Sequence, residues 1–162
     1  ADKAFQAELP AFRFKNICLL APGADFPTFA KITSRPQRFE TLRIFTMHEE
    51  LEKKDHMIPV VYPHSILYFV SGVADRDESG DRPILGLARH LDPRLYKTLG
   101  IHDPQVEAAH KFLEELAQSS GSSPVVWTVT RDTDPAGRKS SATRHGAFDN
   151  DPLTIESVRS YL

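Results

Sequence analysis

His145 is the residue of this sequence best suited to acid–base chemistry. It lies in a polar loop directly before Gly146, after a strongly apolar run and ahead of a C-terminal helical pattern. A general base must reach the group whose proton it takes, and a histidine in a loop after a strand meets that need. The alternative is a surface loop in which Asp149 and Asp151 only cap the final helix. The residues alone leave both interpretations open.

The sequence gives less support to a reactive cysteine or to a metal site. Cys18, the one cysteine, lies inside an apolar run, where burial disfavours the reactive thiolate, so we expect it to be part of the core. The seven histidines do not form a His-x-x-x-His pair on one element, and there is no second cysteine. We therefore expect neither a metal site nor a cofactor.

Three apolar segments are predicted to be buried strands and would have to position His145. They are residues 16–21, 42–47 and 124–130. Their apolar character is continuous rather than alternating, which is typical of parallel strands that are covered on both faces. The last of them leads into the loop that contains His145.

Helices are predicted between and after these strands. Asp-Pro pairs at 103–104 and 151–152 each place a capping carboxylate before a proline at the first helical position. Residues 63–71 suit a helix or a strand, and we choose a helix. Alternating strands and helices predict one α/β domain over residues 1–162, a three-layer sandwich with a small, mainly parallel sheet. The apolar stripe of the last helix is predicted to be Ile155, Val158 and Leu162.

This order of elements resembles the C-terminal half of an α/β-hydrolase. Residues 15–25 (KNICLLAPGAD) resemble the strand that follows the nucleophile helix, and residues 42–47 resemble the next strand, after which that family places its acid. His145 falls at the position of the catalytic histidine after the last strand. The resemblance implies an esterase- or lipase-type hydrolase acting on a small ester, with His145 as the general base of a Ser-Asp-His triad.

The resemblance also suggests two candidates for the acid of the triad. Residues 55–59 read Asp-His-Met-Ile-Pro, similar to the Asp-x-x-Val-Pro pattern common around that acid, so Asp55 ranks first. Glu50 lies closer to the end of the strand and ranks second. The acid would accept the imidazole N–H, fix its tautomer and stabilise the imidazolium. The alternative is a solvated, charged turn with alternating signs.

The sequence departs from the family at the nucleophile. The Gly-x-Ser-x-Gly elbow should precede the first strand, but residues 1–15 contain neither serine nor glycine. We therefore expect a module that supplies acid and histidine, is inactive alone, and is completed by a missing N-terminal half. The alternative is a non-catalytic interaction or dimerisation domain, in which the bare strand edge at 16–21 pairs with another chain or a second copy.

Composition narrows the range of partners. Hydrophobic residues make up 40% and charged residues 26% of the chain, which is typical of a globular domain. The net charge is −2 and the basic residues are scattered, so we expect no nucleic-acid partner. No apolar run approaches the roughly 20 residues of a transmembrane helix. One cysteine and no signal pattern at residues 1–6 favour a reducing, cytoplasmic location.

Overall fold

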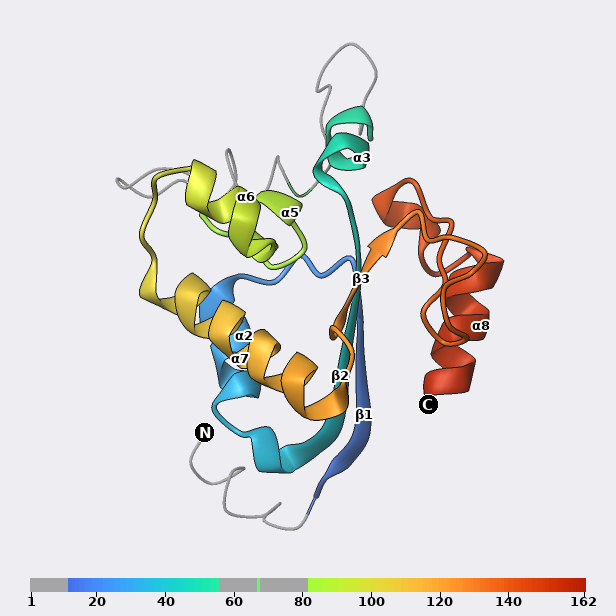
Figure 1. The fold of residues 1–162 in the computed structure, drawn as a ribbon, viewed down its shortest axis with the longest axis horizontal. Helices are drawn as coiled ribbons and strands as arrows, with labels where there is room; N and C mark the ends of the chain where they lie inside the picture. The colour runs from blue at the N-terminus through green and yellow to red at the C-terminus, as the bar shows by residue number, and fades with distance from the viewer. Residues whose placement is uncertain (1–11, 56–66, 68–81) are drawn as a thin grey trace, which may run out of the picture.

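A three-stranded parallel sheet organises the chain, with β2 in its centre (Figure 1). The computed structural model describes residues 12–55, 67 and 82–162. The strands are β1 (Phe14–Leu20), β2 (Phe39–Met47) and β3 (Val125–Thr128), in the order β1-β2-β3. Both pairings are parallel, with Ile17 opposite Leu42 and Ile44 opposite Val125. The predicted α/β class and parallel sheet are confirmed, although β3 is shorter than predicted.

Helices cover both faces of this sheet, and others lie near the carboxyl ends of its strands (Figure 1). On one face lie α2 (Phe26–Thr33) and α7 (Pro104–Ser120), and on the other lies α8 (Pro152–Tyr161). Near the carboxyl ends lie α3 (Glu49–Lys54), α5 (Ala88–Leu91) and α6 (Pro93–Thr98). Two short 3-10 helices, η1 (Pro36–Arg38) and η3 (His145–Ala147), complete the described elements. The helix predicted at 63–71 lies outside the described residues, apart from Leu67.

Aspartate caps start four of these helices. The predicted caps Asp103 and Asp151 accept hydrogen bonds from backbone N–H groups in the first turns of α7 and α8. Asp25 and Asp92 do the same for α2 and α6, each with a proline at one of the first two helical positions. A side-chain oxygen at this position satisfies N–H groups that have no partner within the helix. Local sequence alone therefore determines where these helices begin.

Two apolar cores lie on the two faces of the sheet. Successive residues of a strand point to opposite faces, so Ile44 packs against α2 and α7 while Phe45 packs on the other face. Both side chains are fully buried, which explains the continuous apolar run. The second core includes Met47, Val126 and Phe148. It therefore packs the last strands against the region that follows His145.

The predicted apolar stripe of α8 is only partly correct. Val158 packs against the second core, but Leu162 is 66% exposed, and the buried residues of α8 are Thr154 and Ser157. Ser157 donates to the carbonyl oxygen of Lys139 and accepts from its N–H group, each at 2.8 Å. α8 thus packs partly against the polar backbone of the preceding loop, so buried hydroxyl groups beside the predicted stripe provide part of its contacts.

Candidate functional site

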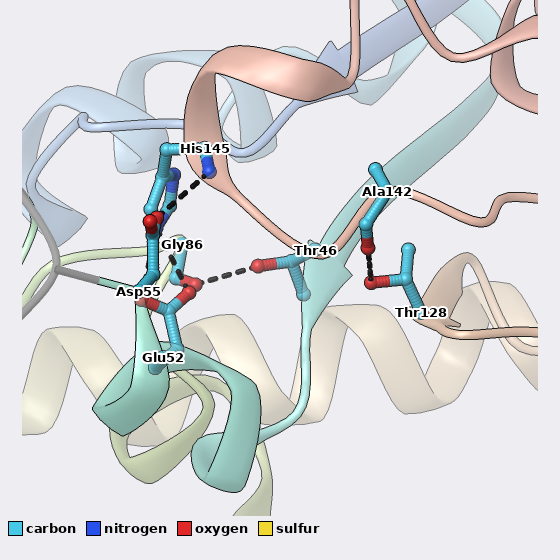
Figure 2. Close-up of polar contacts among 7 residues, drawn as sticks. All are labelled: Thr46, Glu52, Asp55, Gly86, Thr128, Ala142 and His145. Atoms are coloured by element: carbon cyan, nitrogen blue, oxygen red, sulfur yellow. Dashed lines mark hydrogen bonds and ion pairs between the residues drawn. The ribbon is translucent and has the colours of Figure 1, made fainter.

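Threonines near the ends of β2 and β3 attach two loops to the sheet. The Thr46 hydroxyl donates to the carbonyl oxygen of Gly86 at 2.6 Å, and the Thr128 hydroxyl donates to that of Ala142 at 2.7 Å (Figure 2). Both threonines are fully buried. Because β2 and β3 are parallel, their carboxyl ends meet at one edge of the sheet, and Thr128 holds the chain three residues before His145.

A buried polar network around Asp151 holds the other side of this loop. The Asp151 carboxylate accepts from the Ser141 N–H and the Thr154 N–H, both at 2.9 Å, and from the hydroxyl groups of the same two residues. Burial would raise the pKa of Asp151, but the hydrogen bonds from Ser141 and Thr154 outweigh it and hold this pKa below its usual value. The loop before His145 is therefore fixed to the start of α8.

Two carboxylates of the α3 region hold His145 (Figure 2). Its Nε2 atom lies 2.9 Å from each carboxylate oxygen of Glu52. Its backbone N–H donates to Asp55 Oδ2, also at 2.9 Å. The Glu52 side chain is completely buried and that of His145 is 10% exposed. The contact is therefore one that solvent screens little.

The carboxylate at the imidazole is thus neither of the two that the sequence favoured. Asp55 follows the last residue of α3 and bonds the backbone of His145 instead of its ring. Glu50 is two positions from Glu52, and residues two apart on a helix do not share a face. Glu50 accordingly lines a groove to which neither Glu52 nor His145 contributes. A helix assignment for 49–54 would have separated Glu52 from Glu50, but which side of the helix meets His145 depends on the tertiary structure.

The geometry assigns different roles to the two ring nitrogens. A carboxylate that accepts from Nε2 of His145 leaves the lone pair of a neutral imidazole on Nδ1. Within the described part of the chain, Nδ1 has no hydrogen-bond partner. In a Ser-His-Asp triad the acid accepts from Nδ1 and Nε2 takes the proton. Here the acid contacts Nε2 instead, so the two nitrogens have the opposite arrangement.

The other side chains that could react, Cys18, His90 and His110, are partly or fully buried. Burial raises the pKa of Cys18 to about 11, although the nearby Arg43 guanidinium acts in the opposite direction. His90 is buried and its Nδ1 accepts from the N–H of Ile84 at 3.1 Å. His110 donates from Nε2 to the carbonyl oxygen of His90 at 2.7 Å, and burial lowers the pKa of His110. Among the described residues, no cluster of three or more His, Cys, Asp or Glu side chains could hold a metal ion.

Comparison with known proteins identifies no relative. No family model matches the chain, and no curated protein or solved structure matches it either. No helix within residues 12–55, 67 and 82–162 is long and apolar enough to cross a membrane.

Proposed function

We propose that this chain supplies the histidine and the acid of a serine-hydrolase-type site that acts on small esters. The observation behind the proposal is the contact between the His145 imidazole and the buried Glu52 carboxylate. Glu52 follows β2 and His145 follows β3, which is the order of acid and histidine in the α/β-hydrolases that the sequence resembles. Glu52 takes the position for which Asp55 and Glu50 were the candidates.

The surroundings of this pair suit proton transfer. A buried carboxylate beside an imidazole stabilises the imidazolium that forms when the ring takes a proton. Glu52 would fix the ring and its tautomer, while Nδ1 of His145 would accept the proton of an attacking hydroxyl. Asp55 would act as a positioning residue, because it holds the backbone of His145. Positioned general bases of this kind typically accelerate reactions by about 10²- to 10⁴-fold.

The nucleophile and the oxyanion hole would come from another polypeptide segment. The sequence contains no Gly-x-Ser-x-Gly elbow. β1 forms one edge of the sheet, and Phe14 and Leu20 on it are 51% and 37% exposed. A strand added along β1 would cover these side chains and extend the sheet. That edge is therefore where we place the completing segment.

The test uses the protein as its native cell produces it. A fluorophosphonate probe labels activated serines, and p-nitrophenyl butyrate reports ester hydrolysis. We expect His145→Asn to abolish labelling and lower hydrolysis at least about 100-fold, and Glu52→Gln to lower it about tenfold or more. His102→Asn is the matched control, because the His102 side chain is 88% exposed. Glu50→Gln controls for removal of a charge from α3.

Two results would overturn the proposal. One is hydrolysis and labelling that persist unchanged in both His145→Asn and Glu52→Gln. The other is a native product whose intact mass equals the 18.2 kDa of this chain, with neither a labelled serine nor a co-purifying partner. In that case acyl transfer by this chain would lack a nucleophile.

The same exposed edge favours a second candidate, a dimerisation domain. The Ala21 N–H donates to the carbonyl oxygen of Phe45 at 2.8 Å, so alternation along β1 turns the backbone groups of Asn16, Cys18 and Leu20 outward. A two-fold axis at Ile17 would then pair two β1 strands antiparallel. This register places the exposed Phe14 opposite Leu20 of the second copy.

Sedimentation measurements distinguish this candidate from the first. If β1 forms a dimer, the wild-type chain will sediment as a dimer and Leu20→Lys as a monomer, because the added charge blocks edge pairing. Leu99→Lys is the matched control, since Leu99 is 36% exposed and lies outside the sheet. A monomeric wild-type chain at high concentration would rule out this candidate.

A further inference from the structure

A groove runs beside β3 and is distinct from the His145 site. It consists of two adjoining hollows of about 730 and 450 Å3 that share Asp92 and Arg94 at the start of α6. The larger hollow is lined by one side of α3, the start of α6, and Thr128 and Val129. The smaller is lined by α6, α7 and residues of the 123–127 segment. We call the two hollows together the β3 groove; Figure 1 shows the elements around it.

The backbone of β3 is open toward this groove at Trp127. The Ile44 N–H donates to the carbonyl oxygen of Pro124 at 2.9 Å, and Ile44 lies opposite Val125. In a parallel ladder, alternate residues of a strand bond to the same neighbour. Val126 therefore bonds to β2, and the N–H and C=O groups of Trp127 point away from it. No other described residue bonds these two groups.

Arg138 already covers the beginning of the same edge. Its guanidinium donates to the carbonyl oxygen of Ser123 at 2.5 Å and to that of Val125 at 3.3 Å. Side-chain coverage of this kind blocks strand pairing at a sheet edge. An added strand can therefore pair only at Trp127, because β3 ends at Thr128. The backbone thus sets where a partner would sit along the groove.

The groove is apolar along its walls and acidic in its charged residues. Trp127 stacks with His48, with ring centroids 5.5 Å apart, and Val129 is 52% exposed. Other apolar residues lining the groove are Leu91, Pro93, Leu95, Leu113 and Ala117. Its charged residues are four carboxylates (Glu49, Glu50, Asp92 and Glu114) and two basic side chains (Lys54 and Arg94). Asp92 already pairs with Arg94, and Glu49 with Lys53. The remaining carboxylates, Glu50 and Glu114, still outnumber Lys54, which favours a cationic occupant.

We propose that the β3 groove binds an extended peptide segment of another protein, in which apolar residues alternate with lysine or arginine. In an extended chain, successive side chains point to opposite sides. One set would contact the apolar wall around Trp127, and the other would reach the carboxylates, while the peptide backbone pairs with Trp127. Backbone pairing is confined to Trp127, because Arg138 covers the edge before it and β3 ends at Thr128, so the rest of the peptide contacts the groove through its side chains.

Trp127 is the only tryptophan of the chain, so its fluorescence reports this groove directly. The probe is a capped hexapeptide of alternating valine and lysine, and the matched peptide has glutamate in place of lysine. We expect a saturable change in Trp127 fluorescence with the lysine peptide and at least about tenfold weaker binding of the glutamate peptide. Methylation of the backbone nitrogens of the lysine peptide should weaken binding by a similar factor, because it removes the N–H donor to the Trp127 carbonyl oxygen and crowds the edge.

Adjacent residues of α7 provide a matched pair of variants. Glu114 lines the groove, whereas Glu115 pairs with Lys111 outside it. We expect Glu114→Lys to weaken the lysine peptide about tenfold and Glu115→Lys to leave it unchanged. Equal binding of both peptides, equal effects of both variants or no saturable change would overturn the proposal. A fluorescence change that depends on protein concentration without peptide would also overturn it, since a second copy would then occupy the groove.

Discussion

The contact between His145 and Glu52 makes a quantitative prediction about stability. Glu52→Gln keeps the volume of the side chain but removes its charge, and His145→Asn removes the ring. The backbone N–H of His145 remains in the second variant, so its bond to Asp55 is retained. A cycle of the two single variants and the double variant therefore isolates the interaction between the imidazole and the carboxylate.

The structure sets the size of that interaction. Nε2 lies 2.9 Å from both Glu52 oxygens, and the Glu52 side chain is fully buried. A hydrogen bond to a charged group contributes about 1.5–3 kcal/mol. We therefore expect a coupling free energy of about 2 kcal/mol between positions 52 and 145. Each single variant should lower the free energy of unfolding by a similar or larger amount, because one buried partner is left behind.

Urea unfolding at pH 7, followed by circular dichroism, measures the four free energies of unfolding. A parallel cycle pairs His145→Asn with Glu50→Gln, whose side chain lies on the groove side of α3. Those two changes should add to within about 0.5 kcal/mol. A coupling below about 0.5 kcal/mol between positions 52 and 145 would refute the argument. The buried contact would then couple the two residues no more strongly than residues that do not touch.

Three further predictions concern the support of the site. The lowered pKa of Asp151 means that its ionised form stabilises the fold above about pH 4, the usual aspartate pKa, and that this contribution disappears as pH falls through the folded-state pKa. Asp151→Asn should therefore lower the free energy of unfolding by about 2 kcal/mol at pH 7 and by much less near pH 2, as measured by urea unfolding; an equal loss at both pH values would contradict this. Gly86→Ala should lower the free energy of unfolding by about 2 kcal/mol or more, because the new Cβ would lie 2.6 Å from the carbonyl oxygen of Pro22. An unchanged melting temperature would contradict this, because it would show that the contact relaxes without cost. Thr128→Val should lower stability by about 1–2 kcal/mol and reduce the coupling between positions 52 and 145, because it releases the loop before His145; full retention of that coupling in the cycle would contradict this role.

Features encoded in consecutive residues were predictable. The apolar runs at 16–21 and 42–47 became β1 and β2, because an apolar segment without periodicity is stable where both faces are covered. The Asp-Pro pairs became the starts of α7 and α8, because a cap depends only on the residues next to it. The place of His145 between the last strand and the last helix followed from the same local patterns, although His145 begins the 3-10 helix η3 instead of lying in a loop.

The partners of His145 depended on contacts between distant segments. Glu52 lies within a charged stretch that looks solvated in sequence, yet the helical phase of α3 turns it inward while Glu50 faces the β3 groove. The buried hydroxyl of Thr154 likewise donates to Ser140, in the loop that packs on α8. The sequence by itself determined the strands, the helix starts and the place of the histidine. Only the tertiary structure decided which carboxylate meets the imidazole, because that choice depends on the rotation of α3 and on residues more than 90 positions apart.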